Sequence, residues 1–122
     1  MEAAESQLRD EMIRARLLPL FWSEAAARVR SMEAQLEALL DTDAPERRRE
    51  ITETLARDAH SLVGSSRTLQ IRGVDVHAAR LEWLFGGDGE SGSELATTAR
   101  PDLDAITRLV AEAGRASGGV SR

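Results

Sequence analysis

A histidine at position 60 stands out among the residues that could do chemistry, because the segment around it reads LARDAHSLVGSSR. A solvent-exposed imidazole is largely neutral at neutral pH, so one of its ring nitrogens is free to act as a nucleophile. On a helix, the surface neighbours of such a residue lie three, four and seven positions away. These neighbours are Ala56, Arg57, Val63, Gly64 and Arg67.

The residue types in this patch suit phosphoryl chemistry. Arg57 and Arg67 can pair with phosphate oxygens through charge-assisted hydrogen bonds. Gly64 removes a side chain where a partner has to approach the imidazole, and a glycine inside a helix costs about 1 kcal/mol relative to alanine. Ala56 and Val63 keep the rest of the patch small and apolar, as on many docking surfaces. An ordinary helix surface, with an incidental histidine and a packing or kinking glycine, stays open at this point.

The helix that carries His60 is predicted to span about 45–70. Its core-facing residues repeat at alternating steps of four and three: Ile51, Leu55, Ala59, Leu62, Ser66 and Leu69. An α-helix turns about 100° per residue, which places His60 roughly 140° from the mean direction of this seam. We therefore expect its side chain on the solvent side.

Four further helices are predicted. The first, about 4–17, places Leu8, Met12 and Ala15 at helical spacing, and a second begins near Pro19 and runs to Leu40. The others are expected at about 73–85 and from near Pro101 onward, with the segment 94–100 left open because a residue before proline disfavours helix. The apolar stripes of these helices comprise Phe21, Ala25, Val29, Met32, Leu36, Leu39, Val74, Ala78, Leu81, Leu84, Phe85, Leu103, Ile106, Leu109 and Val110.

These helices are joined by short connections, and no segment alternates with the period of a strand. The expected fold is all-α: an antiparallel up-down four-helix bundle with an additional short N-terminal helix. We expect a single domain over residues 1–115, a flexible loop at 86–93, and a disordered tail at 116–122.

Composition excludes several classes of function. The chain has 122 residues, no cysteine and a net charge of −5, so thiolate sites are excluded and nucleic acid is not an expected partner. Neither a signal peptide nor an apolar run long enough to span a membrane is present, which predicts a cytoplasmic protein without membrane contact. The second histidine, His77, has no recognisable metal spacing, so no metal site is expected.

The segment around His60 resembles the signature of histidine-phosphotransfer (HPt) domains. The matching positions are Ala59, His60, Leu62, Gly64, Ser65 and Ser66, and a Leu-Glu pair at 81–82 and a Phe-centred helix at 21–40 agree with the family plan. The resemblance implies a four-helix bundle in which His60 is the phosphoacceptor. It also implies a phosphocarrier without catalytic activity of its own, whose partners are response-regulator receiver domains and histidine kinases of two-component phosphorelays. The receiver domain, not this chain, would bring Mg²⁺.

Two positions depart from that signature. Val63 stands where the family has a lysine that favours the phosphorylated form, and Arg57 or Arg67 could supply the missing charge. Gln70 stands where many members have a glycine that ends the helix, which predicts that the helix runs on towards Gly73.

Two other functions therefore stay open beside phosphotransfer. One is an HPt-like adaptor that binds a kinase or receiver without being phosphorylated. The other is the N-terminal phosphoacceptor domain of a chemotaxis-type histidine kinase.

Overall fold

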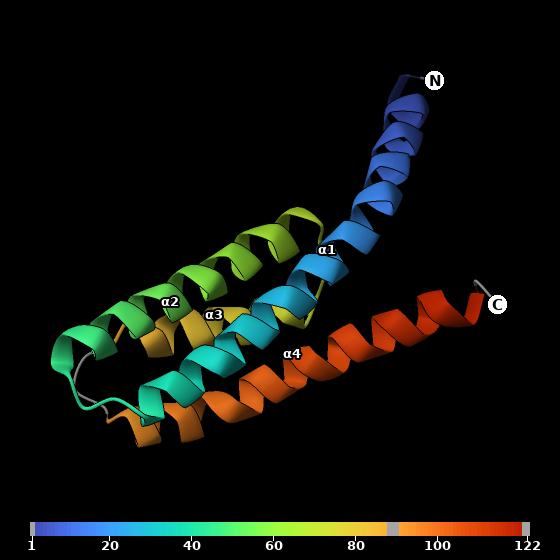
Figure 1. The fold of residues 1–122 in the computed structure, drawn as a ribbon. Helices are drawn as coiled ribbons and strands as arrows, with labels where there is room; N and C mark the ends of the chain where they lie inside the picture. The colour runs from blue at the N-terminus through green and yellow to red at the C-terminus, as the bar shows by residue number, and fades with distance from the viewer. Residues whose placement is uncertain (1, 88–90, 121–122) are drawn as a thin grey trace.

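Four helices make up the residues described by the computed structural model, 2–87 and 91–120, and no strand occurs among them. They are α1 (Glu2–Leu40), α2 (Pro45–Thr68), α3 (Val74–Phe85) and α4 (Gly92–Val120). Successive helices run in opposite directions, and the first turn of α1 and the last turn of α4 lie at the same end of the bundle (Figure 1). The all-α prediction is confirmed, and the arrangement is that of an up-down bundle.

The core follows the predicted stripes closely. Buried side chains of α1 and α2 are Phe21, Ala25, Val29, Met32, Leu36, Leu39, Ile51, Leu55, Ala59, Leu62, Val63 and Ser66. Those of α3 and α4 are Val74, Ala78, Leu81, Leu84, Phe85, Leu95, Ala99, Leu103 and Ile106. Spacings of three and four residues put each set on one side of its helix, so four such sides enclose a single apolar core.

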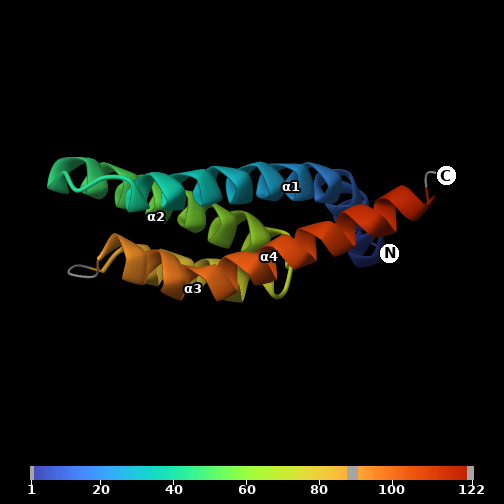
Figure 2. The same cartoon turned by 60° about the horizontal axis from the view of Figure 1, so that its bottom comes forward.

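The predicted separate N-terminal helix of about 4–17 is instead the first part of α1, which continues through Pro19. Proline lacks an N–H, so the carbonyl of Ala15 loses its intrahelical donor, but both residues are exposed and water can reach that carbonyl. Figure 1 shows α1 changing direction between its N-terminal turns and the part that packs in the bundle. The N-terminal turns extend beyond the end of α2 (Figures 1 and 2).

Helix α2 begins at Pro45, as predicted, but it ends at Thr68 and does not run on towards Gly73. Gln70 takes a left-handed conformation with φ 57°, the position that glycine usually fills after a helix. The amide of Ile71 donates to the Ser66 carbonyl at 2.8 Å, and the amide of Gln70 donates to the Arg67 carbonyl at 3.1 Å. This is the Schellman pattern of hydrogen bonds, which closes the helix without a glycine.

Helix α4 starts at Gly92, well before Pro101, because Ser91 caps it. The Ser91 hydroxyl accepts a hydrogen bond from the amide of Glu94 at 3.2 Å, and its carbonyl accepts one from the amide of Leu95. Pro101 lies inside the helix at an exposed position. At the other end α4 continues to Val120, through most of the tail expected to be disordered at 116–122. Residues 121–122 of that tail, and 88–90 of the predicted loop, lie outside the described residues.

Candidate functional site around His60

His60 lies on the solvent side of α2, where the helical phase predicted it, and its side chain is 75% exposed. Its Nδ1 is 2.6 Å from Oε2 of Glu82 on α3. An ionised carboxylate can only accept a hydrogen bond, so this contact places a proton on Nδ1 of the imidazole. In a neutral ring the lone pair then belongs to Nε2, which is the nitrogen available as a nucleophile.

A groove between α1 and α2 runs beside the imidazole. Its volume is about 640 Å³, and the residues that line it are Leu17, Leu20, Phe21, Glu24, Arg28, His60, Ser61, Gly64, Ser65, Thr68 and Leu69. The groove is apolar near Leu17 and Leu20, which are both exposed, and polar near His60. Of the patch predicted from the sequence, only His60 and Gly64 line this groove, while Ala56, Arg57, Val63 and Arg67 do not. The α1 side was not predicted, because the relative phase of two helices cannot be read from either one alone.

Gly64 forms part of the groove wall one turn from His60. A β-carbon added at Gly64 would meet no atom within 4 Å apart from its own helix backbone and immediate chain neighbours. Packing within the described part of the chain therefore gives no reason for a glycine here. The bare backbone leaves room beside the imidazole instead.

The two predicted phosphate-neighbouring arginines are both exposed on α2. Arg57 donates from Nη2 to Oγ1 of Thr54 at 3.1 Å, a contact that a competing anion can replace. Arg28 of α1, which the sequence reading missed, lines the same groove and is held by Asp58 at 3.1 Å and Glu24 at 2.9 Å. In the sequence, the four-residue spacing between Glu24 and Arg28 predicts an ion pair on one face of a helix, and this spacing could have identified Arg28.

The burial of Val63 contradicts one prediction. It was expected in an exposed apolar patch with Ala56, but it is only 5% exposed and belongs to the core, while Ala56 is half-buried against the core. The reason is that α3 packs against this side of α2, as the contact of His60 with Glu82 shows. The buried side of α2 is therefore wider than its apolar seam indicates, and Gly64 and Arg67 remain as exposed docking candidates.

His77 lies apart from this site and joins α3 to α4. Its Nδ1 is 2.7 Å from Oδ1 of Asp102, and Arg80 approaches the same carboxylate oxygen at 3.7 Å. Across residues 2–87 and 91–120, no group of three or more His, Cys, Asp or Glu side chains comes together in a way that could hold a metal ion. The contact between His77 and Asp102 links α3 to α4, and this structural role accounts for the pair.

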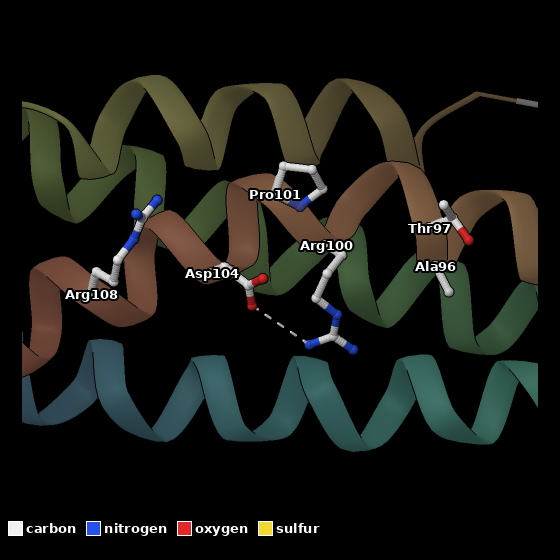
Figure 3. Close-up of a pocket in the computed structure, with 6 residues that line it drawn as sticks. All are labelled: Ala96, Thr97, Arg100, Pro101, Asp104 and Arg108. Carbon is white, nitrogen blue, oxygen red and sulfur yellow. Dashed lines mark ion pairs between the residues drawn. The ribbon is translucent and has the colours of Figure 1, made fainter.

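A larger hollow than the groove, about 820 Å³, lies along α4 and does not include His60. Figure 3 shows its six lining residues, all on that helix: Ala96, Thr97, Arg100, Pro101, Asp104 and Arg108. Asp104 lies 3.9 Å from Arg100, so the charge of this arginine is partly neutralised. No histidine lies among these residues, and size alone does not make this hollow the functional site.

No helix in the described ranges is both long enough and apolar enough to cross a membrane.

Comparison with known families identifies the whole bundle. The family model of the Hpt domain matches residues 16–116, which is most of the chain. Comparisons with curated proteins and with solved structures gave no match. The match includes His60, Glu82 and both sides of the groove, and agrees with the four-helix arrangement. The chain therefore belongs to the Hpt domain family, the phosphocarrier modules that take part in histidine phosphotransfer in two-component phosphorelays.

Proposed function

We propose that this protein accepts a phosphoryl group on Nε2 of His60 and exchanges it with the aspartate of a response-regulator receiver domain. The observation that carries the proposal is the orientation of the imidazole. Its Nδ1 lies 2.6 Å from Glu82, while the side chain as a whole is 75% exposed. This arrangement presents the Nε2 lone pair to an approaching phosphoryl donor.

The transfer step needs no proton movement at the ring that attacks. Nε2 forms a bond to phosphorus as the bond from phosphorus to the aspartate oxygen breaks, and the aspartate leaves as a carboxylate. The product ring carries phosphate on Nε2 and keeps the proton on Nδ1, so it is positively charged. The Glu82 carboxylate faces that charge and favours it over the neutral ring. Transfer in the other direction reverses these steps.

The remaining residues contribute position and charge. Arg57 and Arg67 are proposed to pair with the phosphoryl oxygens in place of the family lysine, because the residue at that position, Val63, is buried. Gly64 and the half-buried Ala56 are proposed to lie under the docked receiver domain. In-line alignment of donor and acceptor is the main contribution that a carrier makes to such a transfer.

The receiver domain is proposed to supply the catalytic Mg²⁺, so this chain would need no cofactor and have no catalytic activity of its own. A histidine kinase is the other proposed partner. The cytoplasmic location stays a prediction from the sequence.

Transfer to receiver domains tests the proposal. The protein is first phosphorylated with phosphoramidate, freed of the donor, and mixed with Mg²⁺ and each receiver domain encoded in its own genome. We expect at least one receiver to gain the phosphoryl group while the carrier loses it, and His60→Gln to abolish the exchange. If receivers bind wild type and His60→Gln equally and none gains phosphate, the protein is an adaptor and the proposal is wrong.

A further inference from the structure

The groove beside His60 does not end at the last turn of α2. A second hollow, of about 560 Å³, continues it along the N-terminal turns of α1, and Leu17, Thr68 and Leu69 line both hollows. This second hollow is the groove extension, and Ile13 is among its other lining residues. The family match begins at residue 16, so Ile13 lies before the part of the chain that the Hpt domain accounts for.

One face of α1 lines the groove and its extension. It carries residues at steps of four, three and four: Ile13, Leu17, Leu20 and Glu24. At 100° per residue these four span about 60° of arc. Ile13 is 51%, Leu17 40% and Leu20 66% exposed. Three large apolar side chains therefore stand open to solvent along one continuous wall.

In the other direction from His60 the space between α1 and α2 has a different character. The ion pair of Arg28 with Asp58, at 3.1 Å, crosses from one helix to the other. Beyond it lies a hollow of about 550 Å³ that is lined mainly by polar and charged side chains, and none of the large exposed apolar side chains in the described ranges lines it. The cores of protein interfaces are depleted in charged residues. A partner that docks at His60 therefore finds its apolar contacts in the direction of Ile13.

Two contacts set the heights of α1 and α2 against each other. Arg28 lies opposite Asp58, and Nε of Arg14 donates to the carbonyl of Leu69 at 2.9 Å. Interpolation between these contacts sets His60 at the height of about residue 25 of α1.

The groove and its extension fit within one ordinary protein interface. Ile13 lies about 19 Å from the height of His60 along α1. A standard interface buries about 800 Å² of each partner, which corresponds to a face roughly 32 Å across. A face of this size centred near Leu20 covers both His60 and Ile13.

We propose that the receiver domain that exchanges phosphate with His60 also covers the groove extension and contacts Ile13. This inference rests on the proposed function, because the receiver is the partner that has to reach His60. Ile13 adds apolar area to the interface and takes no part in the chemistry. It therefore sets how tightly a receiver binds, and not how fast the bound pair reacts.

Ile13→Ser and Met12→Ser form a matched pair of variants. Both residues are exposed neighbours in one helix, at 51% and 60%, but Met12 points about 110° away from the groove face and lines neither hollow. Isothermal titration calorimetry measures the Kd for the receiver that takes part in transfer, or that binds without it. Ile13→Ser should raise this Kd and the KM of transfer roughly fivefold and leave kcat unchanged. Met12→Ser should leave all three as in wild type.

The reaction with phosphoramidate should be the same in wild type and both variants, and circular dichroism checks their helix content. If Ile13→Ser binds the receiver like wild type, or if both variants lose affinity equally, this inference is wrong while phosphotransfer stands. If a receiver binds without gaining phosphate, the phosphotransfer proposal is wrong, and the same affinities still decide what covers Ile13. A protein that binds no receiver overturns both. If Ile13→Ser changes only self-association in sedimentation velocity, a second copy covers the groove extension and the inference is overturned.

Discussion

The contact between His60 and Glu82 joins side chains that are 22 positions apart in the sequence and lie on two different helices. It is solvent-accessible, so its contribution to the stability of the fold is small. Its chemical effect is larger, because a carboxylate on one side of an imidazole decides which nitrogen keeps the proton. The same contact offsets positive charge on the ring once phosphate is attached.

Glu82→Gln should slow the reaction with phosphoramidate roughly threefold to tenfold, since an amide can donate to Nδ1 as well as accept from it. The ring is then no longer held in one tautomer. Nitrogen-15 NMR of the histidine ring reads the tautomer, and intact mass against time reads the rate. Glu37→Gln removes an exposed charge of α1 as a control. An unchanged rate and an unchanged tautomer ratio would refute the role given to Glu82.

Gly64→Ala separates stability from function. Because the added methyl group meets no atom outside its own stretch of helix, the free energy of unfolding should rise by about 0.5–1 kcal/mol. The reaction with the small donor phosphoramidate should be unchanged, while transfer to a receiver domain should slow. Gly114→Ala is the matched control, since a β-carbon added at this position of α4 also meets open space. A Gly64→Ala variant that transfers to receivers at the wild-type rate would remove the docking role of this position.

At the residue scale, the sequence predicted the exposed side of α2 and the place of His60 on it, because helical phase follows from spacing alone. It did not predict the contact with Glu82 or the burial of Val63. Both depend on how closely α3 approaches α2, and that distance is set by packing between helices.

Among the helices, α2 is followed by a residue type that is unusual in this position, because glutamine replaces the usual glycine. Gln70 holds a left-handed conformation that costs a residue with a β-carbon about 1 kcal/mol relative to glycine. The Schellman hydrogen bonds from Gln70 and Ile71 stabilise the turn despite this cost.

Gln70→Gly should therefore raise the free energy of unfolding by about 0.5–1 kcal/mol, after allowing for the greater freedom of glycine in the unfolded chain. Gln70→Ala, which keeps the β-carbon, should change it little. Urea denaturation followed by circular dichroism measures both. Equal stability of the glycine and alanine variants would show that the left-handed conformation carries no strain.

The apolar stripes of all four helices were predictable because their spacing of three and four residues is a property of the sequence. Two of the three prolines were misread. Pro19 and Pro101 were taken as helix starts, but both are exposed, so water reaches the carbonyls that lose their donors and the helices continue. The start of α4 had a signal of its own in Ser91 and Glu94, a serine followed three residues later by a glutamate.

For the whole molecule, the bundle serves as a rigid support for one exposed histidine. Among the described residues the core is apolar except for Ser66, whose hydroxyl donates to the Val63 carbonyl at 3.2 Å. The proposed site is a surface and not an enclosed cavity, which suits a partner that brings its own catalytic groups. The N-terminal turns of α1 extend beyond this support.

Metal removal tests this division of labour between the two molecules. Excess EDTA should leave the reaction of this protein with phosphoramidate unchanged, because no metal takes part in the proposed acceptor site. The same EDTA should stop transfer to a receiver domain, and added Mg²⁺ should restore it. Loss of phosphoramidate labelling in EDTA would place a metal requirement on this chain and contradict the account.

The most direct test of the central claim is the intact mass of the protein after reaction with phosphoramidate, read at alkaline pH and again after brief acid treatment. Wild type and His77→Gln should each gain one acid-labile phosphoryl group, and His60→Gln should gain none. His77 makes the same kind of contact, from Nδ1 to Asp102, but its side chain is only 29% exposed against 75% for His60, which makes it the matched control. Equal labelling of wild type and His60→Gln, or labelling lost only in His77→Gln, would contradict the assignment of His60 as the phosphoacceptor.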